Sequence, residues 1–184
     1  MRIFRSTLAA LLLLAVCVGL SQAQTPTVRL YFDTALTAES KNCPPAGGLD
    51  SMFVVAQQFN DLISGLELAV TFPVTMTWVA DAGTPPVTFG TSPTGISMGW
   101  SLPQNVFGKF RAYTILFTWN CSGCSVTDTP VVVSPHPIFG AVRATQWPTN
   151  QFINAIGMTG LICATVPVED TTWGRVKALY TAAP

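Results

Sequence analysis

The Cys121-Ser-Gly-Cys124 motif has the clearest chemical potential in this sequence. Two cysteines at C-x-x-C spacing can form a redox-active dithiol, as in thioredoxin-like proteins, or can hold zinc together with two further ligands. A redox motif normally lies beside a βαβ pattern, whereas this one follows a predicted strand. Cys43 and Cys163 could supply the two other zinc ligands, so zinc stays an open alternative. The interpretation we favour is a structural disulfide that closes a tight turn.

One histidine, His136, is the other residue that could take part in catalysis. A Ser-His-Asp triad needs a carboxylate that orients the histidine and a serine beside it, and the sequence has no G-x-S-x-G motif. A glycosidase needs two facing carboxylates, which the sequence does not pair. Because His136 lies between Pro135 and Pro137, we expect it to be exposed in a loop. The sequence therefore predicts a protein that is not an enzyme, with a hydrolase as the least favoured alternative.

Tryptophans in or beside predicted loops point instead to binding. Exposed aromatic rings on a β-sandwich can stack on the apolar faces of sugar rings. The alternative is that each ring closes an end of the sandwich or lies under a partner. We take Trp100 and Trp147 as the candidate ligand-binding residues. No cofactor is predicted because no EF-hand, P-loop or dinucleotide motif is present, although a structural calcium ion held by loop carboxylates stays an alternative.

The elements that would position these residues are β-strands, and two long ones are predicted within residues 63–80, on either side of Pro73. Apolar residues alternate along both halves, which is the period of a half-buried strand. Proline lacks an amide donor and suits a corner at which the chain passes from one sheet to another. The alternating positions are Leu66, Leu68, Val70 and Phe72 in the first strand and Val74, Met76, Trp78 and Ala80 in the second.

The other strands are predicted from the same alternation and from the turn residues between them. They cover residues 27–33, 51–59, 87–90, 96–100, 110–120, 131–133, 138–144 and 158–166, whereas residues 151–154 are predicted to be irregular. Short strands at this spacing favour an all-β fold, a two-sheet antiparallel β-sandwich of Ig-like or jelly-roll type.

The first 23 residues have the features of a cleaved signal peptide. A short basic start is followed by an uncharged apolar run at residues 8–20, and Ser21-Gln22-Ala23 fits a small-residue cleavage site. The apolar run is shorter than the about 20 residues that a membrane span needs. We expect an exported chain without a transmembrane span after cleavage, located outside the cell, at its surface or in the periplasm.

Export decides how the remaining cysteines are interpreted. Oxidising compartments favour disulfides, and four cysteines allow three pairings. We expect Cys121–Cys124 and Cys43–Cys163. The second bond would close a loop over most of the mature chain, which is worth about 4–5 kcal/mol in the loop-entropy model.

The mature chain is predicted to hold one β-sandwich domain at residues 24–170 and a short C-terminal helix and tail at 171–184. In the second segment Trp173, Val176 and Leu179 fall at helical spacing. Only 10% of the residues are charged, with 9 basic against 9 acidic before the two arginines of the leader are removed. This balance argues against a nucleic-acid partner, which would need clustered Lys and Arg.

Two stretches carry a resemblance to known proteins. VRLYFD at 28–33, followed by a strand and ISGLELAVTFP at 63–73, resembles the opening of small exported bacterial β-sandwich proteins, distantly related to cohesin-like and carbohydrate-binding-module-like folds. TTWGRVKALY at 171–180 resembles the closing segment of uncharacterised exported bacterial proteins. Together they cover roughly a fifth of the mature chain. The resemblance implies an exported, Gram-negative-type protein with a sandwich core and no enzyme activity, and it supplies no contact residues for the docking function of cohesins.

These observations predict a secreted or cell-surface, non-catalytic β-sandwich module for binding or structural assembly. Its partner would be a protein or a polysaccharide at the cell surface. One alternative is a carbohydrate-binding module that uses the loop aromatics. Another is a subunit of an extracellular assembly that associates with itself, because low charge and a hydrophobic fraction of 49% favour exposed apolar patches and open strand edges.

Overall fold

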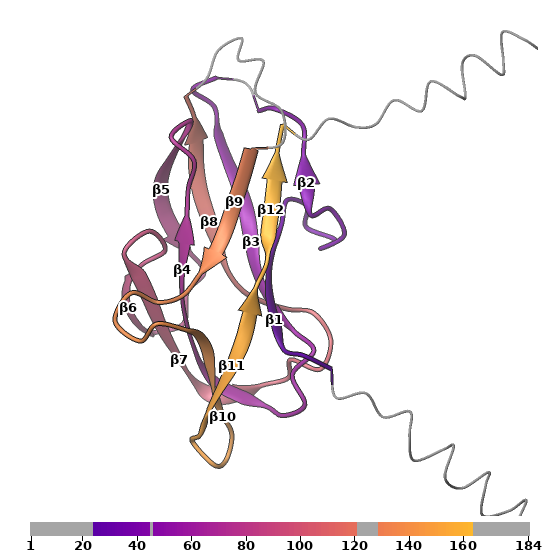
Figure 1. The fold of residues 1–184 in the computed structure, drawn as a ribbon, viewed down its shortest axis with the longest axis vertical. Coiled ribbons are helices and arrows are strands. Elements are labelled where there is room, and N and C mark those ends of the chain that lie inside the picture. Colours follow the sequence, from indigo (N-terminus) through magenta and orange to yellow (C-terminus); the bar gives the residue numbers. More distant parts are fainter. Residues whose placement is uncertain (1–23, 45, 121–128, 164–184) are drawn as a thin grey trace, which may run out of the picture.

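The computed structural model describes residues 24–44, 46–120 and 129–163, which form twelve strands and no helix (Figure 1). The predicted signal peptide, the Cys121–Cys124 pair and the C-terminal helix lie outside these residues. Among the residues described, no helix is long and apolar enough to cross a membrane. The strands are β1 (Thr27–Tyr31), β2 (Ser40–Lys41), β3 (Leu49–Gln57), β4 (Ile63–Thr71), β5 (Met76–Ala82), β6 (Val87–Thr91), β7 (Gly95–Gln104), β8 (Phe110–Trp119), β9 (Thr129–Ser134), β10 (Val142–Gln146), β11 (Phe152–Gly157) and β12 (Thr159–Ile162).

The strands make two layers, which we name sheet I and sheet II. Sheet I runs β1–β3–β8–β5 and is antiparallel throughout. Sheet II has β4 at its centre, with β7 and then β6 on one side. On the other side β10 and β9 pair with successive parts of β4, followed by β11 and β12, and β2 runs parallel to β12 at the edge. A parallel pairing of β1 with β11 joins the two sheets along one side.

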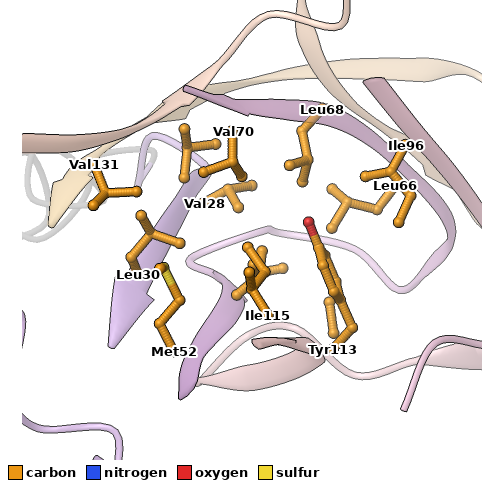
Figure 2. Close-up of a cluster of buried hydrophobic side chains, with 14 of the residues drawn as sticks. Val28, Leu30, Met52, Leu66, Leu68, Val70, Ile96, Tyr113, Ile115 and Val131 are labelled. Carbon is orange, nitrogen blue, oxygen red and sulfur yellow. The ribbon is translucent and has the colours of Figure 1, made fainter. Parts of the chain in front are cut away.

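The core lies between the sheets and is filled by the predicted alternation. Figure 2 shows side chains of β4, β7 and β9 pointing toward side chains of β1, β3 and β8. The inward positions of β4 and of β8 are at most 1% exposed, namely Leu66, Leu68 and Val70 from β4 and Tyr113, Ile115, Phe117 and Trp119 from β8. Burial of each large apolar side chain is worth about 1.5–3 kcal/mol, so this layer dominates the stability of the fold.

The predicted corner at Pro73 is confirmed, because β4 belongs to sheet II and β5 to sheet I. Two local predictions are wrong. The segment 151–154 is not irregular, since residues from Phe152 onward form β11 between β10 and β1. A strand was not expected in the polar loop after β1, where β2 pairs with β12 over two residues. Both strands lack a contrast between apolar and polar faces, which is the signal that sequence patterns provide.

A disulfide joins Cys43, just after β2, to Cys163 at the end of β12, as the sequence predicted. The bond ties a long surface loop to the last described strand. Because both sulfur atoms are used, neither cysteine is left to bind zinc together with Cys121 and Cys124.

Candidate protein-binding face

The outward residues of five strands of sheet II form a regular grid. Their chain neighbours on β4, β7 and β10 are buried in the core, so the alternate positions point away from it. One row across the strands contains Phe89, Ser97, Glu67, Arg143 and Asn154, and the next contains Val87, Gly99, Gly65, Thr145 and Phe152. We call this surface of β6, β7, β4, β10 and β11, together with the loop 135–141 beside it, the open face.

Large apolar side chains of the open face are exposed to solvent. Their exposed fractions lie between 41% and 79%, and the residues are Val87, Phe89, Ile138, Phe139, Phe152 and Ile156. Soluble proteins rarely expose contiguous apolar patches of this kind unless they bind a partner there. The sequence pattern does not distinguish these residues, because an apolar residue at an outward position gives the same signal as a core residue.

The middle of the open face is flat because two of its outward positions are glycines. A Cβ atom added to Gly65 would lie 3.0 Å from the Thr145 Oγ1 atom and 3.1 Å from the Met98 carbonyl oxygen, so a side chain has little room there. A Cβ added to Gly99 would be in ordinary contact with Val87, at 3.7 Å. Neither glycine has a side chain, so no side chain stands at these two positions of the row between Val87 and Phe152.

One ion pair lies within this apolar surface. The Arg143 Nε atom donates a hydrogen bond to the Glu67 Oε2 atom, and the two side chains are 19% and 17% exposed. The guanidinium carbon of Arg143 lies 3.9 Å from the ring centres of both Phe139 and Phe152, so aromatic rings bracket the cation. No other charged residue occurs on the five strands of the open face.

His136 positions the loop 135–141 against β7. The prediction that it is exposed is wrong: its side chain is only 4% exposed. Its Nδ1 atom accepts a hydrogen bond from the Ile138 amide at 3.2 Å, and its Nε2 atom lies 3.4 Å from the Ser97 Oγ atom. The Phe139 and Gly140 amides donate hydrogen bonds to the His136 carbonyl oxygen and close a turn in this loop.

The close approach of this loop depends on Gly95, whose φ is +99°. A Cβ atom there would lie 2.6 Å from the Pro137 Cδ atom and 2.9 Å from the His136 Nε2 atom. A shallow pocket of about 260 Å³ remains beside the loop, lined by Phe89, Ser97, His136, Ile138 and other residues. The ring of His136 bonds to a backbone amide and a serine rather than to a carboxylate, so this pocket lacks the orienting acid of a hydrolytic triad.

A larger pocket of about 390 Å³ opens between β5 and β6 and contains Asp81. The Asp81 carboxylate accepts hydrogen bonds from the Trp78 Nε1 atom, the Ser92 amide and the Ser92 hydroxyl, at 2.6–3.1 Å. The Ser92 Oγ atom also lies 2.8 Å from the Tyr113 hydroxyl oxygen, and burial raises the pKa of that tyrosine. The Asp81 carboxylate thus holds the β6–β7 turn against sheet I. Because these hydrogen bonds occupy it, the arrangement does not favour a role as a catalytic base.

The two tryptophans proposed to bind ligand have different surroundings in the structure. Trp100 is partly buried against the core, and its ring meets Phe110 edge-on with the ring centres 5.5 Å apart. Trp147 is 45% exposed just after β10, where its amide donates to the Leu62 carbonyl oxygen. The ring of Trp100 therefore contacts Phe110 at the edge of the core, and a role in glycan binding stays a prediction for both residues.

The outer face of sheet I, which we call the covered face, is built differently. Tyr31, Phe53 and Val55 point outward but are at most 7% exposed, because the loop after β1 lies over them and packs Leu36 on them. The Lys109 ammonium lies 4.4 Å from the Tyr31 ring centre. A partner could not reach these apolar side chains without moving the loop.

The covering loop is fastened by Asp33. Its carboxylate accepts hydrogen bonds from the Thr37 and Ala38 amides and from the Thr37 hydroxyl, at 2.7–2.8 Å. The bond from the Ala38 amide is the main reason why the pKa of Asp33 lies below its ordinary value. The charged form of Asp33 therefore holds the loop closed.

Comparison with solved structures finds the same fold in cohesin domains. The third ScaB cohesin of R. flavefaciens, solved in complex with a group 1 dockerin, matches with a TM-score of 0.51 and 13% identity over 80% of this chain and 99% of that one. CaCohA2 of Clostridium acetobutylicum, solved in complex with CaDoc0917, matches with a TM-score of 0.50 and 11% identity over 77% and 100%. No protein-family model matches the sequence, and no curated protein resembles it. The chain is a cohesin-like β-sandwich, as its resemblance implied.

Proposed function

We propose that this chain is a non-catalytic module that binds another protein through the open face. The observation that supports this most strongly is the cluster of exposed apolar side chains around the Glu67–Arg143 pair. Protein interfaces have an apolar centre with few charged residues, and aromatic and arginine side chains supply most of their binding energy. The cohesin-like fold supports the same function, because two of the similar domains were solved with dockerin partners.

The shape of the open face favours a protein over a small molecule. A small-molecule site is a deep cleft that encloses most of its ligand. Here the exposed side chains are spread over five strands, and the pocket beside His136 is shallow. A partner segment that lies across the strands could cover all of them at once.

The place of action that we propose is outside the cell, at its surface or in the periplasm. The Cys43–Cys163 disulfide supports this, because such bonds persist in oxidising compartments and are rare in the cytosol.

The test is affinity capture from the extracellular and envelope fractions of the producing cells, with the oxidised chain from Gln24 as bait. Three baits are compared: the natural sequence, the double variant Phe89→Ser/Phe152→Ser on the open face, and the control Val74→Ser. Val74 is 99% exposed in the turn between β4 and β5, away from the open face. We expect a protein that the first and third baits retain and the second loses, with affinity for the purified partner lowered by at least tenfold.

Two outcomes would contradict the proposal. If all three baits retain the same proteins, the open face is not the binding surface. If the natural chain instead binds an insoluble polysaccharide, and Trp147→Ala loses this binding while Phe89→Ser/Phe152→Ser keeps it, the module recognises glycans through the predicted aromatic site.

A further inference from the structure

We propose that the open face also binds a second copy of this chain, so that a weak symmetric dimer covers it until another partner competes. This inference rests on the proposed function, because it uses the same surface. It names a specific second occupant of the open face. It also implies competition, because a chain in the dimer could not bind the other partner at the same time.

The first argument is electrostatic. A two-fold dimer places the same patch on both sides of the interface, so the patch must be complementary to itself. The strands of the open face contain one acidic and one basic residue, Glu67 and Arg143, which are neighbours on β4 and β10. A two-fold axis that runs along the strands between β4 and β10 sets Arg143 opposite the partner's Glu67 and Glu67 opposite the partner's Arg143. No like charges then face each other across the contact.

Both members of the ion pair keep hydrogen-bonding capacity for a second copy. A guanidinium has five N–H donors, and among the residues that the structure describes Arg143 donates a hydrogen bond only from its Nε atom, to Glu67. The Arg143 side chain is 19% exposed, so part of it reaches solvent. Within the described residues the Glu67 Oε1 atom accepts no hydrogen bond, since Arg143 contacts the Oε2 atom. The rings of Phe139 and Phe152 hold the guanidinium plane in place, which lowers the entropic cost of a second contact.

The second argument is shape. The same axis keeps each row of the grid in register and lays β7 over the partner's β11. Gly99 and Phe152 lie in one row, so each Phe152 ring would lie over the partner's Gly99, where no side chain stands in its way. Rotation about an axis parallel to the strands also leaves the strands of the two copies nearly aligned. Aligned sheets twisted by about 30° and about 10 Å apart are the usual way in which two sheets pack face to face.

The size of the face predicts that the dimer is weak. Strands lie about 4.8 Å apart and successive outward residues of one strand about 6.7 Å apart, so the four strands that would face the second copy, β7, β4, β10 and β11, offer an area of about 20 Å by 20 Å. This is about half of the roughly 800 Å² that each partner contributes to an interface of standard size. We therefore expect dissociation constants between about 10 µM and about 1 mM, which leaves the face available to a tighter partner.

The experiment is sedimentation equilibrium of the oxidised chain from Gln24 over about 1 µM to about 1 mM. The variants Glu67→Arg and Arg143→Glu are each measured alone and then mixed in equal amounts. Each variant alone places like charges opposite one another, and we expect its dimerisation to weaken by at least tenfold. In the mixture, the two arginines that Glu67→Arg presents would meet the two glutamates that Arg143→Glu presents, so association should return as a heterodimer.

Recovery in the mixture is the decisive result, because a variant that merely misfolds cannot be rescued by another variant. A monomer at all concentrations would overturn the inference. So would a dimer that neither variant weakens, or weakening without recovery in the mixture. The control Leu49→Arg, on the exposed start of β3, should leave the natural dimer unchanged. A failure here is distinct from a failure of the proposed function, since capture of a different protein by the open face does not require the dimer.

Discussion

Both outer faces of the sandwich have aromatic and aliphatic residues at outward strand positions. On the covered face these are Tyr31, Phe53 and Val55, and on the open face they include Val87, Phe89 and Phe152. The first three are at most 7% exposed, and the other three are at least 55% exposed. The difference comes from what lies above the strands. A loop and two cations cover sheet I, whereas on sheet II the loop 135–141 stands beside the apolar residues and adds two more of them.

This comparison shows that covering segments, rather than the composition of the strands, decide which face of a sandwich is available for binding. On the covered face Arg111 and Lys109 lie over aromatic rings as part of the cover. On the open face Arg143 is held between two rings and paired with Glu67, so its positive charge is neutralised without hiding the apolar residues. We therefore expect the covered face to contribute to the stability of the fold, and the binding that we propose uses the opposite face.

The largest effect on the free energy of unfolding is expected from removing the Cys43–Cys163 bond. This change should lower the stability of the chain without changing its binding to a partner. The double variant Cys43→Ala/Cys163→Ala frees a loop of 120 residues and should lower the free energy of unfolding by about 4–5 kcal/mol. Urea denaturation with the oxidised natural chain as reference measures this. The open face contains neither cysteine, so partner capture below the unfolding midpoint should be unchanged. A parallel loss of capture would mean that the two properties are not separate.

The next largest effect is expected for Phe53→Ala on the covered face. The ring is 7% exposed and packs with Tyr31, Val55 and Leu36, so truncation leaves a cavity and should cost about 3 kcal/mol. Thermal or urea unfolding is the measurement. A cost below about 0.5 kcal/mol, as for ordinary surface positions, would show that the loop does not function as a cover.

A smaller, pH-dependent effect is expected at Asp33. Its pKa is lowered in the folded chain, so its contribution to holding the loop is present above the unfolded pKa of about 3.9 and is lost as pH falls through the lower folded value. The amide resonances of Thr37 and Ala38 should therefore shift in acid. In Asp33→Asn this acid transition should be absent, because no carboxylate remains to titrate. A transition that persists in the variant would assign it to another group.

The smallest effect on folding is expected for Phe89→Ser. Its ring is 70% exposed, so the free energy of unfolding should change by no more than about 0.5 kcal/mol. Binding to a protein partner should nevertheless weaken. If Phe89→Ser destabilised the chain as much as Phe53→Ala, the two faces would not differ in the way proposed.

Much of the fold followed from the sequence because its signals are local. Alternation at Leu66, Leu68 and Val70 marked a strand with one buried side, and Pro73 marked the passage between sheets. Four cysteines in a chain predicted to be exported indicated two disulfides, and of the two expected bonds Cys43–Cys163 is confirmed.

The candidate face could not be predicted, because it depends on non-local register. Phe89, Glu67, Arg143 and Phe152 come from four strands, and only pairing brings them together. The strand that contains Phe152 was missed because its exposed side is apolar, which removes the contrast between faces. Similar reasoning explains His136: its two flanking prolines gave no sign that Gly95 would let the loop pack against β7.

The Cys43–Cys163 bond also limits how far this molecule can be stretched. Figure 1 shows that β1 begins in the lower part of the domain and β12 ends near the top, so tension applied through these two ends would pull along the strands. Once the strands separate, each released residue adds up to about 3.6 Å of length. The covalent link between residues 43 and 163 keeps everything between them out of the path of the force. In a domain that tethers one extracellular component to another, only the short segments outside the linked loop would be stretched, and the open face, which lies wholly inside that loop, would not bear the tension directly.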